Sequence, residues 1–306
     1  MTAQTAQQEK RTAALSSVIA AVGLTSFKVV VGILTNSLGI LAEAAHSALD
    51  LVAALMTFFA VRVADKPADE QHHFGHGKAE NVSALFETLL LLATSGWIIY
   101  EATHRLTSPE IHVGVSVWSF IVMGTSIVID ATRSRILMAA AKKHNSQALE
   151  ADALHFSTDI WSSSVVILGL ILVLIGRSFP ALAFLEKGDA IAALAVAVIV
   201  IFVAGQLGLR AVQSLMDAAP KNGASDQIIE QVGKMRKIAN VHAVRIRPSG
   251  AGWFVDLHVV MDGNLSLTES HRVTERVEKK VQSILPNSDV TVHVEPLEKA
   301  EPPSKE

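Results

Sequence analysis

Six long apolar stretches most constrain what this 306-residue chain can fold into. A helix needs about 20 apolar residues to cross the hydrocarbon core of a bilayer. We place six such segments at residues 12–34, 38–62, 80–106, 113–139, 148–176 and 189–209. The mean hydropathy of +0.38 and the charged fraction of only 18% are typical of a membrane protein rather than a soluble one. The sequence therefore predicts an all-α membrane domain with six transmembrane helices.

Lys and Arg residues gather on one side of these six segments. That side, with the N-terminal tail and the loops after the second and fourth segments, holds Lys10, Arg11, Arg62, Lys66, Lys78, Arg133, Arg135, Lys142 and Lys143. The opposite side holds Arg105, Arg177 and Lys187. Because positively charged loops stay in the cytoplasm, we expect both termini to be cytoplasmic.

From Pro220 onward the composition becomes that of a soluble domain. A helix is expected from Ser225, strands over 241–247 and 253–261, a second helix over 268–285 and a last strand over 289–295. The order αββαβ predicts a small ferredoxin-like α+β domain. We divide the chain into a cytoplasmic N-terminal tail (1–11), the membrane domain (12–209), a linker (210–222), the cytoplasmic domain (223–297) and a disordered tail (298–306).

Composition also limits the chemistry. The chain has no cysteine, so disulfides, thiolate metal sites and cysteine nucleophiles are excluded, and a tight metal site must use His, Asp and Glu. The net charge of −3 gives no basic surface for nucleic acid. An intramembrane metallohydrolase would need an open zinc site with a catalytic acid, and no HExxH motif is present. We therefore expect neither an enzyme nor an organic cofactor.

Two His-x-x-x-Asp pairs lie inside apolar segments: His46 with Asp50, and His155 with Asp159. Residues four apart share one helix face, so two facing helices would bring two imidazoles and two carboxylates together. Four such ligands in a tetrahedron suit Zn²⁺. Each pair can instead be a local hydrogen bond at a helix end. However, ionisable residues in apolar spans are costly and usually functional, and the spacing occurs twice.

With these pairs and the segment FGHGKAE at residues 74–80, the chain resembles the cation diffusion facilitator family over nearly its whole length. The resemblance implies a homodimeric metal/proton antiporter in the bacterial inner membrane that exports metal from the cytoplasm, with a metallochaperone-like cytoplasmic domain. A non-transporting metal sensor or scaffold of the same family is the alternative, although it would not need a complete set of four ligands.

The resemblance also implies further sites. It places a second metal site in the loop at Asp69, His72 and His76, to which His73 can add a ligand. It places a dimer-interface metal cluster, structural or regulatory, at His242, His258, His271, His293 and Glu295. It implies a salt bridge between Lys78 and Asp217 and a hydrophobic gate at Leu154. The alternatives are incidental histidines, solvated charges and an ordinary apolar helix residue.

His46 bears on the identity of the metal. Much of the bacterial iron- and zinc-handling branch of the family has Asp at this position, whereas a His at this position resembles the zinc-selective branch of the family. A second nitrogen donor favours Zn²⁺, with Fe²⁺, Co²⁺ and Cd²⁺ left open. Metal binding needs deprotonated imidazoles, and the reference pKa of His is about 6.5, so His46 and His155 are natural sites of proton exchange.

Overall fold

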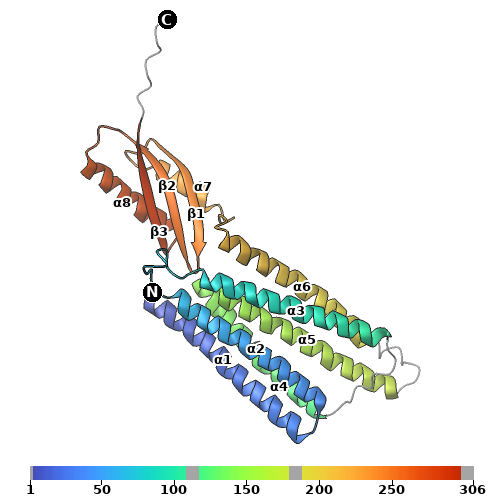
Figure 1. The fold of residues 1–306 in the computed structure, drawn as a ribbon. Coiled ribbons are helices and arrows are strands. Elements are labelled where there is room, and N and C mark those ends of the chain that lie inside the picture. The colour runs from blue at the N-terminus through green and yellow to red at the C-terminus, as the bar shows by residue number, and fades with distance from the viewer. Residues whose placement is uncertain (1–2, 108–116, 179–187, 298–306) are drawn as a thin grey trace. The chain divides into compact units, whose positions relative to one another are not determined.

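The computed structural model describes residues 3–107, 117–178 and 188–297 (Figure 1). It divides into two compact units, residues 1–212 and 213–306. The first unit is built from long helices. They are α1 (Ala3–Leu34), α2 (Leu38–Ala64), α3 (Ala79–Thr107), α4 (Val117–His144), α5 (Gln147–Ser178) and α6 (Gly188–Leu215). The start of the fourth predicted span at residue 113 and the predicted disordered tail lie outside the described residues.

Four stretches of these helices are long and apolar enough to cross a membrane. They are Thr5–Leu34, Glu43–Ala64, Ala79–His104 and Ala193–Leu215. In α4, Asp130 and Arg133 interrupt the apolar sequence, which lowers its hydropathy. The count of six spans therefore stays a prediction, while a helical membrane domain is established for the described chain.

Two helix boundaries differ from the expected ones. Helix α1 begins at Ala3, so most of the residues expected as an N-terminal tail form its first turns. Helix α6 continues to Leu215, into the expected linker. Gln, Glu, Lys and Arg favour helix almost as well as Leu does, so the polar ends of both helices continue the apolar spans without a break.

The first turns of α1 are held by a buried cluster of charges. Lys10 Nζ lies 2.8 Å from Asp65 Oδ1 and 2.9 Å from Glu80 Oε1, with side-chain exposures of 6%, 4% and 0% respectively. Arg11 Nε contacts the other oxygen of Asp65 at 3.1 Å, from a side chain that is 44% exposed. Asp65 ends α2 and Glu80 opens α3, so the cluster fixes both ends of the loop between those helices.

We expect Lys10→Met to destabilise the protein strongly, because two carboxylates would remain buried without their ammonium partner. Removing one member of a buried ion pair costs about 3–5 kcal/mol. Arg11→Ala is the matched control, since an exposed pair contributes less than about 1 kcal/mol. The measurement is the free energy of unfolding in detergent micelles, and equal losses for the two variants would contradict this account of the cluster.

Small residues let the helices of the first unit pack closely. Ala13 and Ala14 of α1 pack with Leu137 of α4 and with Ala153 and Phe156 of α5 in one buried cluster. Small side chains allow the close helix approach that stabilises membrane bundles. This packing places the face of α5 that carries His155 and Asp159 inside the bundle.

The second unit confirms the predicted αββαβ order. It consists of α7 (Ala224–Gly233), β1 (Asn240–Ser249), β2 (Gly252–Met261), α8 (Leu267–Ile284) and β3 (Ser288–Pro296). The sheet order is β1-β2-β3, with β1 antiparallel and β3 parallel to β2. Apolar side chains from both helices and all three strands form its core. Figure 1 shows both helices on one face of the sheet, so the opposite face is left for polar side chains.

Candidate metal centres

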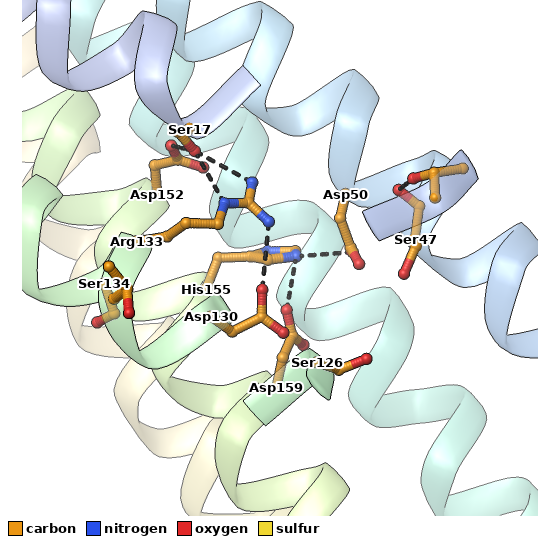
Figure 2. Close-up of polar contacts among 12 residues, drawn as sticks. Ser17, Ser47, Asp50, Ser126, Asp130, Arg133, Ser134, Asp152, His155 and Asp159 are labelled. Atoms are coloured by element: carbon orange, nitrogen blue, oxygen red, sulfur yellow. Dashed lines mark hydrogen bonds and ion pairs between the residues drawn. The ribbon is translucent and has the colours of Figure 1, made fainter. Parts of the chain in front are cut away.

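The four predicted transport residues converge between α2 and α5, and Figure 2 shows three of them, Asp50, His155 and Asp159. His155 Nε2 lies 3.2 Å from Asp50 Oδ1 and 3.6 Å from Asp159 Oδ2. His46 Nε2 lies 3.9 Å from Asp50 Oδ1 and 3.9 Å from Asp159 Oδ1. The sequence predicts that these four residues carry the transported metal, and we call them the transport quartet. The spacing of the two motifs thus predicted a juxtaposition that the fold produces.

The quartet offers donors suited to a cation. His46, Asp50 and Asp159 each present a ligand atom within 4.8 Å of the others, and His155 adds a second imidazole. The side chains of Asp50 and His155 are 12% and 3% exposed, whereas that of His46 is 39% exposed. Two carboxylates buried this close repel each other unless positive charge lies between them. The arrangement can therefore bind either a cation or protons.

A buried arginine lies beside the quartet and was not recognised as a site residue from the sequence. Arg133 Nε and Nη2 donate to Ser17 Oγ at 3.3 and 3.1 Å, and Nη1 donates to Asp130 Oδ1 at 3.2 Å (Figure 2). Ser17 Oγ in turn donates to Asp152 Oδ2 at 3.3 Å. The expectation that Arg133 belongs to a basic cytoplasmic loop was wrong, because the residue is 4% exposed within α4.

A second buried cation joins α1 to α2 near His46. Lys28 Nζ donates to Ser47 Oγ at 2.8 Å and to Glu43 Oε2 at 3.3 Å. Lys28 is only 3% exposed, so its charge needs these partners. Glu43, one turn before His46, is therefore paired within the bundle.

The loop between α2 and α3 forms a second cluster. Asp69 Oδ1 lies 3.2 Å from His72 Nδ1, and Asp69 Oδ2 lies 3.3 Å from His76 Nε2. The backbone amides of His72 and Gln71 donate to Asp69 Oδ1, and these hydrogen bonds hold the pKa of Asp69 below its usual value. The carboxylate is thus ionised and ready to bind a cation at neutral pH. His73 points elsewhere, with Nε2 3.0 Å from the carbonyl of Glu70.

The sheet of the second unit carries the third cluster. His242, His258 and His293 are neighbours across β1, β2 and β3. Glu295 Oε1 lies 2.8 Å from His258 Nδ1, and Oε2 lies 3.3 Å from His242 Nε2. Hydrogen bonding to His258 and the nearby imidazoles lower the pKa of Glu295. The His293 ring lies 4.7 Å from that of His258, centroid to centroid.

The remaining predicted residues lie apart from these clusters. His271 is on α8, 70% exposed, with Nε2 3.6 Å from Glu275 Oε1. Leu154, one residue before His155, packs against the buried cluster formed by Ala84, Ala151, Leu207 and Ala211. The salt bridge expected between Lys78 and Asp217 stays a prediction. Within its own unit, Asp217 lies 3.9 Å from Arg247.

Comparison with known proteins places the whole chain in one family. The family models of the cation efflux transmembrane domain and of the cation efflux protein cytoplasmic domain match residues 14–216 and 220–297. The cation-efflux pump FieF of Cronobacter sakazakii is 31% identical over 288 residues, 93% of this chain and 92% of that protein. FieF of Yersinia pestis is 32% identical over 290 residues, 94% and 92% of the two chains.

Among solved structures, the metal-bound C-terminal domain of the CzcD transporter from Thermotoga maritima is 30% identical, covering 26% of this chain and 90% of that one with a TM-score of 0.23. The two family models follow each other in the order of the two units and cover nearly the whole sequence. The curated relatives are cation-efflux pumps and not enzymes. The chain is an integral membrane cation efflux transporter that belongs to the cation diffusion facilitator family.

Proposed function

We propose that the protein exports Zn²⁺ from the bacterial cytoplasm in exchange for protons, with the transport quartet as the carrier site. The observation that carries the proposal is the convergence of two imidazoles and two carboxylates between α2 and α5. Four N and O donors match the tetrahedral preference of Zn²⁺, whereas Ca²⁺ takes more oxygen ligands and Mg²⁺ prefers oxygen octahedra.

Proton exchange follows from the chemistry of the same four side chains. Imidazole nitrogens and carboxylate oxygens bind a metal only when deprotonated, so zinc binding releases protons. Zinc entering from the cytoplasm would displace protons from the quartet, and protons entering from outside would displace zinc. A ligand that binds two conformations unequally shifts their balance. Alternation between an inward-open and an outward-open form then couples the two fluxes.

The direction of transport rests on the orientation of the chain. The Lys and Arg residues at the start of α1, in the segment between α2 and α3 and in the last turn of α4 support cytoplasmic termini. We further propose six transmembrane helices, which would return the chain to the cytoplasm before α7, and placement in the inner membrane. The family's export direction then carries zinc outward.

The test is cation flux into proteoliposomes with an imposed pH gradient, compared for Zn²⁺, Fe²⁺, Co²⁺, Mn²⁺ and Cd²⁺. We expect zinc to be carried fastest, and we expect its flux to reverse when the pH gradient is reversed. A flux that does not depend on the pH gradient would contradict antiport. A faster flux of another metal would identify that metal, and not zinc, as the preferred substrate.

We propose that His242, His258, His293 and Glu295 bind metal and join two protomers in a homodimer. The second unit has a hydrophobic core of its own, so residues 213–306 should fold alone. We expect Zn²⁺ to raise the dimer fraction of this fragment in sedimentation equilibrium. Glu295→Ala removes the carboxylate shared by His242 and His258 and should abolish the zinc effect, while Glu230→Ala, on the exposed side of α7, should preserve it.

The dimer should dissociate on acidification, because metal binding needs deprotonated ligands. The lowered pKa of Glu295 means that its carboxylate is already charged well below neutral pH, and its contribution is lost only at acid pH. An imidazole binds metal only when deprotonated, so protons compete with Zn²⁺ for the ring nitrogens. The expected result is loss of zinc-dependent dimers as the pH falls from neutral into the acid range. Dimers that persist unchanged at the lower pH would exclude histidine ligation.

A further inference from the structure

Helix α3 carries a buried acid that the transport quartet does not include. Glu87 is 0% exposed in the middle of an apolar helix. Its Oε1 accepts a hydrogen bond from Thr57 Oγ1 of α2 at 3.3 Å. Its Oε2 lies 3.4 Å from His155 Nδ1 of α5. Burying a carboxylate costs free energy unless the group has a partner. The burial of Glu87 between α2 and α5 therefore suggests that the residue has a function.

His155 presents its two ring nitrogens to different partners. Nε2 faces Asp50 at 3.2 Å and Asp159 at 3.6 Å, and Nδ1 faces Glu87. In the described part of the chain, neither Nδ1 nor Glu87 Oε2 makes a hydrogen bond with another group. Both atoms are fully buried. A hydrogen bond of this kind is usually about 2.7–3.2 Å long, so a shift of a few tenths of an ångström would complete it.

We propose that Glu87 is a positioning residue for the transport quartet: its carboxylate holds His155 through Nδ1, so that Nε2 faces the transported cation. The inference rests on the proposed function, because it takes His155 as a ligand. A neutral imidazole that binds metal through Nε2 carries its proton on Nδ1. A carboxylate that accepts this proton fixes both the tautomer and the ring orientation, and metal-binding histidines commonly have such a partner.

The fold supports the same assignment. Thr57 fixes one oxygen of Glu87 and leaves the other directed at His155. The described residues include no Lys or Arg within ion-pair distance of Glu87, and His155 is the basic side chain that reaches it. Three helices therefore meet through one carboxylate, with α2 supplying Thr57, α3 supplying Glu87 and α5 supplying the imidazole.

The test measures zinc binding by the full-length protein in detergent, in a background that carries Asp69→Ala and His258→Ala so that the loop and cytoplasmic clusters do not contribute. Loss of an outer partner of a metal ligand typically lowers affinity about 10–100-fold. We expect Glu87→Leu to show this loss and a matching rise in the KM for zinc transport. Glu87→Gln, whose amide oxygen can still accept from Nδ1, should lose less.

Thr88→Val is the matched control, since Thr88 is the next residue in α3, is 3% exposed and donates its hydroxyl to the carbonyl of Ala84 within its own helix. It should bind zinc as the background protein does. Zinc affinity equal to that of the background protein in both Glu87 variants would overturn the proposal. If Glu87→Leu does not fold, Glu87→Gln carries the test, with a melting temperature near that of the background and a reduced zinc-induced rise in that temperature.

A double-mutant cycle separates positioning from a general structural role. In a His155→Ala background, Glu87→Gln should cause no further loss of zinc affinity, because its effect acts through the imidazole. Independent, additive losses would contradict the proposal. If His155→Ala by itself binds zinc like the background protein, the proposed transport site is wrong. If His155→Ala lowers zinc affinity and Glu87→Leu does not, the proposed transport site stands and only the positioning role of Glu87 is contradicted.

Discussion

Asp159→Ala is expected to abolish zinc transport while leaving the protein folded in the membrane. Asp159, like Asp50, is a carboxylate that both imidazoles of the quartet approach, with His46 at 3.9 Å and His155 at 3.6 Å. Without it, a bound cation keeps only three protein ligands and one negative charge. Removing a hydrogen-bond partner of a metal ligand typically lowers affinity or activity about 10–100-fold. Removing the ligand Asp159 itself should lower zinc flux by more than that. The measurement is initial zinc flux in proteoliposomes at equal protein density.

Asp69→Ala provides the matched control for this variant. It removes a carboxylate that also lies beside two imidazoles, but in the exposed loop between α2 and α3. Zinc flux should continue in this variant. The opposite pattern, with flux retained in Asp159→Ala and lost in Asp69→Ala, would move the carrier site from the quartet to the loop.

His46→Asp is expected to change which metals are carried. His46 supplies one of the two nitrogen donors, and its side chain is 39% exposed, so an aspartate can replace it without a buried cavity. A site with three carboxylates and one imidazole should have a weaker preference for zinc over Cd²⁺, Fe²⁺ and Mn²⁺. We expect the ratio of zinc to cadmium transport to fall on the order of tenfold, equivalent to about 1.4 kcal/mol.

His155→Asp is the informative companion to that variant. It makes the same chemical exchange at a side chain that is 3% exposed, where it would also remove the contact with Glu87. We expect this variant to lose transport of every metal, whereas His46→Asp keeps transport and changes preference. An unchanged zinc preference in His46→Asp would show that the second imidazole does not select the metal.

The element order of the second unit could be predicted because its sequence is locally consistent. Alternation of apolar residues from Val241 to Arg247 and from Trp253 to Met261 predicts two strands, and both are present. Ser266 accepts a hydrogen bond from the amide of Glu269 and begins α8, in the pattern of a capping box. Such signals act within a few residues, so they can be recognised without knowledge of the tertiary structure.

Residues that act through tertiary contacts could not be placed from spacing alone. Arg133 stands among basic residues near the end of α4 and looks like a loop charge, yet it contacts Ser17, which is 116 positions away. Glu87 has no His partner at helical spacing, and its link to His155 appears only when α3 packs against α5. The signal that was available is the general cost of an ionisable side chain in an apolar span.

The central claim is that one zinc ion is bound by both His-x-x-x-Asp pairs, and X-ray absorption at the zinc edge tests it most directly. The sample is the full-length protein carrying Asp69→Ala and His258→Ala, loaded with one equivalent of Zn²⁺. The account predicts four ligands at about 2.0–2.2 Å, two of them imidazoles, and loss of one imidazole in His155→Ala. A six-coordinate ion with water ligands, or a spectrum that His155→Ala leaves unchanged, would contradict it.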